Sequence, residues 1–216
     1  MKKSIYLAVA LLAMTACKQT SSNRHYTRWT ESEINEWYSA QGWCAGCNYV
    51  PSNKVNQIDM WQEESYDHDI MDKELGWAQE IGFNVIRVFL HDMPYYADKE
   101  GFKARLDDFL GICQSHGQKA IITFFTNGGQ QHNRRLGKQP DAIPGTHNKL
   151  WARTPGFDWA RDPERNDSLK NYVQDIISTF AEDDRVFCWY LYNEPWNVSI
   201  YQVNDDHHVD PYPLLT

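Results

Sequence analysis

The sequence predicts an α/β protein with a parallel sheet, and two features support this fold class. Short, nearly continuous apolar runs alternate with longer segments in which apolar residues recur every three or four positions. This alternation is typical of buried parallel strands that are joined by amphipathic helices. The chain has 216 residues, of which 42% are hydrophobic, so it is long and apolar enough for one domain with a substantial core.

Four apolar runs are expected to form strands, because each is rich in β-branched or aromatic residues and is bounded by polar or turn-forming residues. The first run, "WCAGCNYV", ends at Pro51, which cannot donate a hydrogen bond to a neighbouring strand. The other runs are "FNVIRVFL", "KAIITFF" and "RVFCWYLY". The predicted strands are therefore residues 43–50, 83–90, 119–125 and 185–192.

Three segments between these strands are expected to be helices, because each has one apolar face. In the first, Met71, Leu75 and Ala78 share a face, Asp67 is a candidate N-cap, and Gly82 is a stop signal. The predicted helices are residues 64–82, 99–117 and 166–183; the second carries Phe102, Leu106, Phe109 and Cys113 on one face, and the third carries Leu169, Val173, Ile176 and Phe180.

The third strand and the third helix are separated by residues 126–165, a loop of about 40 residues. Loops between a strand and the next helix usually have ~2–6 residues, and much longer ones are often functional. This segment contains Pro140, Pro144, Pro155 and Trp151. Prolines stiffen the backbone, so the segment is expected to form a shaped lid or the wall of a cleft.

Charge and aromatic content restrict the classes of partner. The formal net charge is −8, which argues against nucleic acid and against anionic membrane surfaces. Nine Trp and twelve Tyr are many for this length. Aromatic side chains fill protein cores and also stack on sugar rings, and composition does not distinguish these two uses.

The first 17 residues, "MKKSIYLAVALLAMTAC", have the pattern of a signal peptide, with a basic start followed by a short apolar run. The apolar run is shorter than the ~20 residues that a membrane-spanning helix needs. Thr15-Ala16-Cys17 resembles a bacterial lipoprotein box, in which the cysteine is lipidated; ordinary secretion with an incidental cysteine is the alternative. Residues 18–35 are then expected to be a tether, and the protein is expected in the cell envelope, periplasmic or at the cell surface, or secreted.

Four further cysteines follow, and Cys44 and Cys47 have the CxxC spacing of redox motifs. Such motifs lie where a helix begins, and the residues after Cys47 do not begin one. A zinc site would need a second close pair, whereas Cys113 and Cys188 are isolated. Buried thiols are therefore the favoured interpretation, the redox alternative stays open, and no disulfide pairing follows from the spacing.

Polar residues follow the predicted strands at their carboxyl ends, where sites form in parallel α/β folds. These are Arg87, with His91 and Asp92 after the second strand, Thr126-Asn127 after the third, and Asn193-Glu194 after the fourth. Each has a structural explanation when taken alone, as an ion pair, a satisfied loop histidine or a cap.

The tripeptide Asn193-Glu194-Pro195 has a specific chemical meaning at the end of an apolar strand. An apolar setting would partly desolvate Glu194, which would then donate a proton to a leaving oxygen and later accept one from water. The Asn193 amide can hydrogen-bond a sugar hydroxyl beside the reacting carbon. Pro195 turns the chain out of the sheet.

Three stretches, "GCNYVPSNKVNQIDMWQ", "LGWAQEIGFNVIRVFLHD" and "WYLYNEP", make the chain similar to the clan A retaining glycoside hydrolases, which include glycoside hydrolase family 5 and secreted bacterial cellulases and 1,4-β-xylanases. The resemblance covers about residues 40–195. It implies a TIM (β/α)₈ barrel with Glu194 as general acid/base, Asn193 as the amide that contacts the 2-hydroxyl, and Arg87 beneath the nucleophile. It also suggests the cleft residues Trp43, Asn48, Trp61, His91, His147 and Trp151.

Two features depart from the family pattern. Where the look-alikes have an acidic, aromatic segment after the third strand, this chain has "FFTNGGQQHNRR". A (β/α)₈ barrel needs ~250 residues, and the family's nucleophile, a second Glu on the seventh strand, has no matching position here. We therefore expect a partial barrel, truncated after strand four, over residues 36–197, followed by an irregular tail over 198–216. The tail's "NDDHHVD" could bind a metal, but a solvated polar tail is favoured.

The expected function is hydrolysis of O-glycosidic bonds in β-linked polysaccharide by a retaining mechanism, of the endo-β-glycanase type, with no metal and no organic cofactor. The chain as it stands is expected to be inactive, because only one of the two required carboxylates is matched. The alternative is a non-catalytic glycan-binding lipoprotein or a frameshifted remnant. The expected partners are a β-glycan and, through a lipid anchor alone, a membrane; nucleic acid is not expected.

Overall fold

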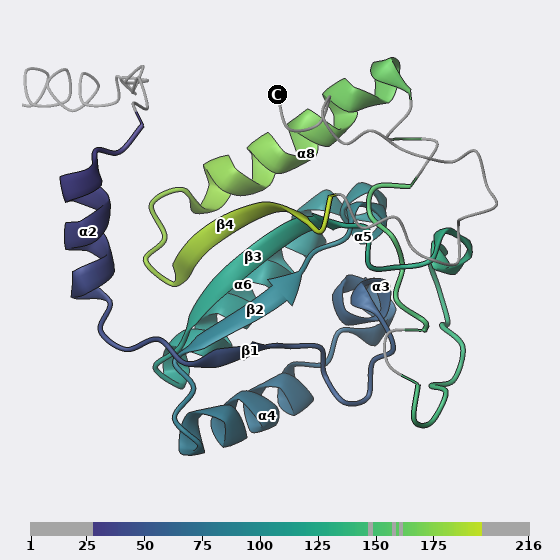
Figure 1. Ribbon diagram of the computed structural model, residues 1–216. Coiled ribbons are helices and arrows are strands. Elements are labelled where there is room, and N and C mark those ends of the chain that lie inside the picture. The colour runs from purple at the N-terminus through teal and green to yellow at the C-terminus, as the bar shows by residue number, and fades with distance from the viewer. Residues whose placement is uncertain (1–27, 147–148, 157–158, 160–161, 196–216) are drawn as a thin grey trace, which may run out of the picture. The chain divides into compact units, whose positions relative to one another are not determined.

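The computed structural model describes residues 28–146, 149–156, 159 and 162–195 (Figure 1). The predicted signal peptide with Cys17, the cleft candidate His147, and the predicted tail over 198–216 lie outside the described residues. The chain divides into two compact units, residues 1–42 and 43–216. None of the described helices is both long enough and apolar enough to cross a bilayer.

The first unit contains helix α2 (Glu31–Ala40). Its first five residues, 31–35, fall in the segment expected to be a tether, whose residues 18–27 lie outside the described residues. A capping box begins this helix: the Glu33 backbone N–H donates to Thr30 Oγ1 at 3.3 Å, and the Thr30 backbone N–H donates to Glu33 Oε2 at 2.7 Å. The helix buries none of its residues within its own unit. Its short sequence gives little apolar periodicity, so the cap was the signal that could have revealed it.

The second unit is built on a parallel sheet with the strand order β1-β2-β3-β4 (Figure 1). The strands are β1 (Gly46–Asn48), β2 (Val85–Phe89), β3 (Lys119–Thr126) and β4 (Val186–Asn193). Arg87 is in register with Asn48 on one side and with Ile121 on the other, and Ile121 is in register with Cys188. Four parallel strands with alternating helices match the first half of a TIM barrel, which confirms the predicted fold class.

The three predicted helices are present as α4 (His68–Glu80), α6 (Lys99–Ser115) and α8 (Pro163–Phe180). Asp67 caps α4 as expected, accepting a hydrogen bond from the Ile70 backbone N–H at 3.2 Å. Gly82 and Gly117 follow α4 and α6 with φ of 90° and 66°, a conformation that glycine adopts without a steric penalty. Short elements that the pattern did not predict are α3 (Gln57–Trp61), α5 (Asp92–Ala97), η1 (Glu63–Ser65) and η2 (Gln131–Asn133).

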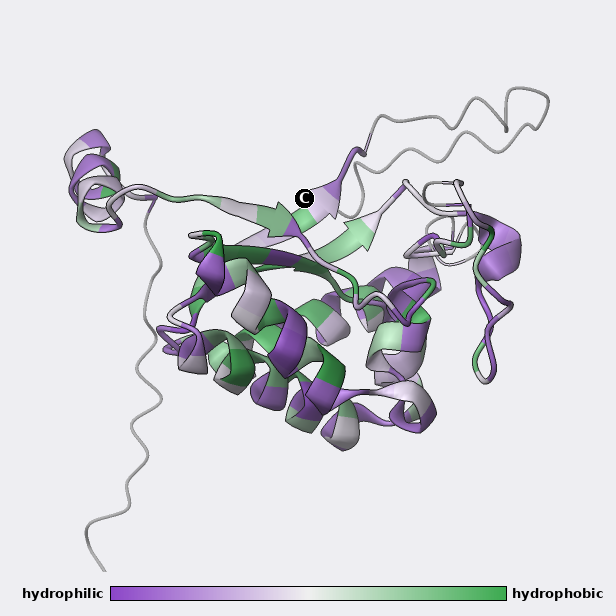
Figure 2. Cartoon of the chain, turned by 90° about the horizontal axis from the view of Figure 1, so that it is seen from below, coloured by the Kyte–Doolittle hydropathy of each residue, from purple (hydrophilic) through white to green (hydrophobic). Residues whose placement is uncertain are grey.

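One hydrophobic core lies between the sheet and helices α4, α6 and α8, which cover one face of the sheet (Figures 1 and 2). The expected apolar faces supply it: Leu75, Phe109 and Ile176 are fully buried. The opposite face of the sheet carries Arg87 and, through the register, Tyr190, which is 42% exposed. Polar groups are therefore concentrated on the face that the helices leave uncovered.

Candidate active site

Arg87 is the central residue of the candidate site, because its guanidinium connects all four strands. Its Nη2 donates to Asn193 Oδ1 at 2.8 Å and its Nε to Thr123 Oγ1 at 3.1 Å. A longer contact, 3.4 Å, joins its Nη1 to Asn48 Oδ1. Strand ends that are distant in sequence are thus brought together as the sequence predicted, with Arg87, Asn193 and Asn48 at one place.

The Arg87 guanidinium also lies between two aromatic rings. Its Cζ is 4.6 Å from the ring centres of both Phe89 and Tyr190. Burial lowers the pKa of Arg87, while negative charge at Tyr190 and Glu194 would raise it. An arginine remains protonated even so, and stacking on aromatic faces stabilises the cation. The site therefore holds a fixed positive charge.

Asn193, the last residue of β4, has a side chain that is held at both ends. Its Oδ1 accepts from Arg87, and its Nδ2 donates to Thr126 Oγ1 at 3.2 Å. The two partners fix which end of the amide is oxygen and which is nitrogen. One lone pair and one N–H remain, which is sufficient for a hydrogen bond to a sugar hydroxyl.

Glu194 follows Asn193 and is exposed in the described part of the chain, whereas its place after an apolar strand predicted partial desolvation. Its backbone adopts φ of 52°, the left-handed region that residues other than glycine rarely occupy. Asn127 contacts this turn, since its Nδ2 donates to the carbonyl oxygens of Glu194 at 3.2 Å and Pro195 at 2.8 Å. The sequence places Asn127 at the end of a predicted strand, but it carries no signal for this contact.

His91 does not line a cleft, contrary to the expectation, because it is fully buried at the start of α5. Its Nδ1 accepts from the Met93 backbone N–H at 3.1 Å, so its Nε2 carries the proton and donates to the Arg153 carbonyl at 3.1 Å. Burial lowers the pKa of His91 to about 4. The imidazole is therefore neutral near pH 7 and has a structural role.

Asp92 is also inaccessible, with 1% exposure. Arg134 donates to both of its oxygens, at 3.0 and 2.8 Å, and Thr154 Oγ1 donates at 2.8 Å. Burial disfavours the charge, but His91 and these donors outweigh it and lower the pKa of Asp92. Asp92 is consequently a buried ion-pair partner, and it does not offer the site a second reactive carboxylate.

Two of the expected cleft tryptophans lie elsewhere. Trp61 is fully buried in the core, where its Nε1 donates to the Phe89 carbonyl at 2.8 Å, so its ring has no face left for a ligand. Trp43 is 88% exposed, but it precedes β1 and so lies at the amino end of the strands, away from Glu194. Neither tryptophan therefore lines a cleft beside Glu194, contrary to the prediction.

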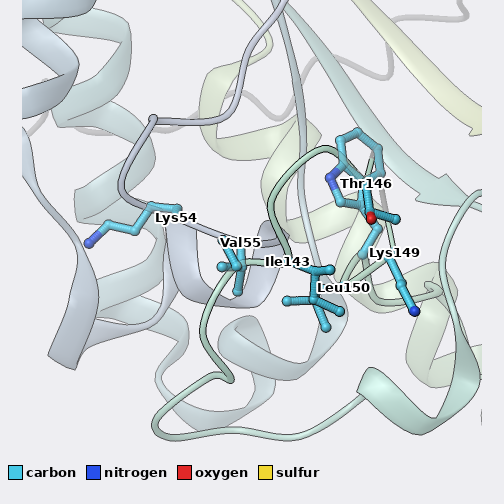
Figure 3. Close-up of a pocket in the computed structure, with 8 residues that line it drawn as sticks. Lys54, Val55, Ile143, Thr146, Lys149 and Leu150 are labelled. Carbon is cyan, nitrogen blue, oxygen red and sulfur yellow. The ribbon is translucent and has the colours of Figure 1, made fainter.

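Trp151 is the aromatic cleft candidate that the structure places near the site. Its ring centre lies 5.1 Å from that of Phe89, one of the two rings that flank Arg87. It lines a pocket of about 160 Å³ between the segment after β1 and the long loop (Figure 3). The pocket is also lined by Lys54, Val55, Ala142, Ile143, Thr146, Lys149 and Leu150.

The cysteines agree only in part with the expectation of buried thiols. Cys113 is buried, and burial raises the pKa of its thiol to about 12, but Cys44 is exposed and Cys47 is half-buried. No disulfide joins any two of the four described cysteines. Cys47 lies in β1 rather than at the start of a helix, so the geometry of a CxxC redox site is missing. Within the described ranges, no group of three metal-ligating side chains comes together.

No protein-family model and no curated protein matches this chain. Similar solved structures include the exo-β-1,4-mannosidase Op5Man5 from Opitutaceae bacterium strain TAV5, at 19% identity and TM-score 0.45, over 69% of this chain and 24% of that one. A GH5_18 protein from Bifidobacterium longum subsp. longum, in complex with Manβ1-4GlcNAc, is 20% identical with TM-score 0.48, over 76% of this chain and 35% of that one. The endo-1,4-β-D-mannanase from Thermotoga petrophila RKU-1 is 20% identical with TM-score 0.40, over 69% and 44%.

This chain thus spans less than half of the length of each of these proteins. The likeness extends over about 70% of this chain. The structural neighbours of the chain are glycoside hydrolases of family 5, as the resemblance in its sequence predicts.

Proposed function

We propose that this chain supplies the general acid/base, and the residues next to it, in the active site of a retaining β-glycoside hydrolase. The observation that carries the proposal is the arrangement at the carboxyl end of β4. There an exposed carboxylate, Glu194, directly follows an amide, Asn193, that Arg87 and Thr126 hold in one orientation. A proton donor beside a fixed hydrogen-bonding group is what cleavage of a glycosidic bond requires at this position.

Each residue has a separate role in this proposal. Glu194 protonates the glycosidic oxygen as the bond to the anomeric carbon breaks, and then deprotonates the attacking water. Asn193 hydrogen-bonds the adjacent sugar hydroxyl, a contact that strengthens in the transition state. Arg87 holds Asn193 in place, and its positive charge favours an ionised carboxylate nearby.

The retaining mechanism needs a second carboxylate ~5–5.5 Å from the first. Asp92 does not supply it, because it is buried and bound to Arg134 and Thr154. The family resemblance puts the nucleophile on a strand that has no match in these 216 residues. Hydrolysis by this chain alone is therefore expected to be absent, while binding of a β-glycan, which does not depend on that carboxylate, is expected to remain.

A binding and hydrolysis assay tests this function. The chain is run through native gels that contain β-mannan, β-glucan or xylan, and sugar release from the same polymers is measured. Retardation by at least one polymer, reduced in Asn193→Ala, and sugar release no higher than that of Glu194→Gln are the expected results. No retardation by any of the polymers would count against a glycan site, and release well above the Glu194→Gln control would show that a nucleophile has been overlooked.

We also propose that the protein is exported and anchored through a lipid on Cys17, which would place it in the cell envelope. The support is the basic and apolar leader that ends in Thr15-Ala16-Cys17. A lipid anchor of this kind would hold the protein near extracellular or periplasmic polysaccharide, where a β-glycan hydrolase acts.

A further inference from the structure

We propose that Asn127 is a positioning residue for Glu194; this inference rests on the proposed function in so far as Glu194 is the acid/base. Asn127 directly follows β3 and is 8% exposed. It contacts the backbone of three consecutive residues at the carboxyl end of the neighbouring strand β4. Its backbone N–H donates to the Asn193 carbonyl at 3.3 Å, and its Nδ2 donates to the carbonyls of Glu194 at 3.2 Å and Pro195 at 2.8 Å.

The orientation of the Asn127 amide is fixed from its other end. Its Oδ1 accepts from Tyr192 Oη at 2.9 Å and from Arg153 Nη1 at 2.5 Å. The Arg153 guanidinium can only donate, so a flipped amide would turn its N–H groups toward that guanidinium and its oxygen toward two carbonyls. The Nδ2 group therefore has to face the turn that carries Glu194.

The turn needs such a contact, because its backbone is in an unfavourable conformation. Glu194 has φ of 52°, and a residue with a Cβ occupies this region only when its surroundings hold it there. Without the hydrogen bonds from Asn127, rotation to negative φ would change the direction in which the carboxylate points. A proton donor must lie within hydrogen-bond reach of the leaving oxygen, so its direction matters for the rate.

A buried polar chain connects this contact to the long loop. The Arg153 carbonyl accepts from Arg134 Nη1 at 2.6 Å and from His91 Nε2 at 3.1 Å. Arg134 in turn donates to both oxygens of Asp92. Asn127 and Arg134 both belong to "FFTNGGQQHNRR", the segment that departs from the family pattern. Two residues of this segment therefore take part in the polar contacts that reach the Glu194 turn.

Two matched substitutions in the full chain distinguish a role of Asn127 in positioning Glu194 from a role in the stability of the whole protein. Asn133 resembles Asn127 in burial, at 7% exposure, and its Nδ2 also donates to two carbonyls, those of Lys149 and Trp151, at 3.0 Å each. Asn127→Asp and Asn133→Asp each replace these donors by a carboxylate oxygen, but only the first touches the Glu194 turn.

The readout is the side-chain carboxyl signal of Glu194 in ¹³C NMR, assigned by its loss in Glu194→Gln. Asn127→Asp is expected to change the chemical shift and the titration midpoint of this signal, while Asn133→Asp leaves both as in the wild type. An unchanged Glu194 signal in folded Asn127→Asp, or equal changes in the two variants, would overturn the proposal. If Asn127→Asp does not fold, Tyr192→Phe removes one donor that orients the amide, and an unchanged Glu194 signal there would overturn it equally.

A kinetic measurement distinguishes failure of this inference from failure of the proposed function. Azide can replace a missing nucleophile, attacking the anomeric carbon of a phenyl β-glycoside while Glu194 protonates the departing phenol. A misplaced donor costs up to about 100-fold in rate, so Asn127→Asp should lower kcat strongly and KM little, and Asn133→Asp should change neither. No azide-dependent reaction in the wild type would count against the proposed function, whereas the NMR result would still decide the role of Asn127.

Discussion

Arg87 Nη2 and Asn193 Oδ1 lie 2.8 Å apart, although 106 positions separate the two residues in sequence. They belong to β2 and β4, and β3 lies between these strands. The contact therefore spans the sheet at its carboxyl end and sets the orientation of the amide next to Glu194.

Arg87→Lys should destabilise the protein, because an ammonium group does not reproduce the three-way contact with Asn193, Thr123 and Asn48. The loss of these hydrogen bonds, of which those to Asn193 and Thr123 are partly buried, is expected to lower the free energy of unfolding by ~1–3 kcal/mol. Urea unfolding measures this. The same exchange at exposed Arg135 is the control, and equal effects at the two positions would contradict the role given to Arg87.

Stability should depend on pH through His91. Its pKa is lowered from 6.5 to about 4 in the folded protein, because burial disfavours the charged form. As the pH falls below 6.5 the unfolded chain binds a proton that the folded chain does not, so the free energy of unfolding decreases between pH 6.5 and 4. The total decrease from this group is on the order of 3 kcal/mol.

His91→Gln should flatten the pH dependence of stability in that window. His68 is the matched control, since its pKa is raised, first of all by its hydrogen bond to Asp108. Its contribution to stability is present below pH 6.5 and is lost as the pH rises through its folded pKa, so His68→Gln should leave the decrease between pH 6.5 and 4 in place. Urea unfolding at several pH values measures both variants, and an unflattened curve for His91→Gln would rule out His91 as the cause.

Cys17→Ala should abolish lipid attachment, because the thiol of Cys17 is the group that a lipoprotein pathway modifies. Expression in a bacterial host with a labelled fatty acid, followed by separation of membrane and soluble fractions, measures this. The wild type should be labelled and membrane-bound and the variant neither; equal labelling of the two would refute the anchor.

The sequence predicted the sheet well because its signals are local. Each predicted strand contains the observed one or ends within one residue of it, and Asp67, Gly82 and Gly117 mark the ends of helices. Helices α3 and α5 were missed because five or six residues are too short to show an apolar period. The cap at Thr30 was present in the sequence and was the signal that could have revealed α2.

The sequence predicted the positions of the site residues that lie on strands. It did not predict the contacts that depend on the path of the long loop. Arg87 and Asn193 converge because parallel strands end at the same edge of a sheet. The burial of Asp92, however, depends on Arg134 and Thr154, which lie in the loop over residues 126–165. The path of such a loop is set by tertiary contacts, which neither apolar period nor residue propensity encodes.

If Glu194 donates a proton to the leaving group, the effect of removing its carboxyl must depend on the acidity of that leaving group. Azide-dependent phenol release is compared for the wild type and Glu194→Gln on aryl β-glycosides whose phenols differ in acidity. Proton transfer by a positioned residue is worth ~10²–10⁴-fold, so Glu194→Gln should lose that much with the least acidic phenol and much less with a nitrophenol, which leaves without a proton. The same loss for every leaving group would show that Glu194 is a structural residue and not the proton donor.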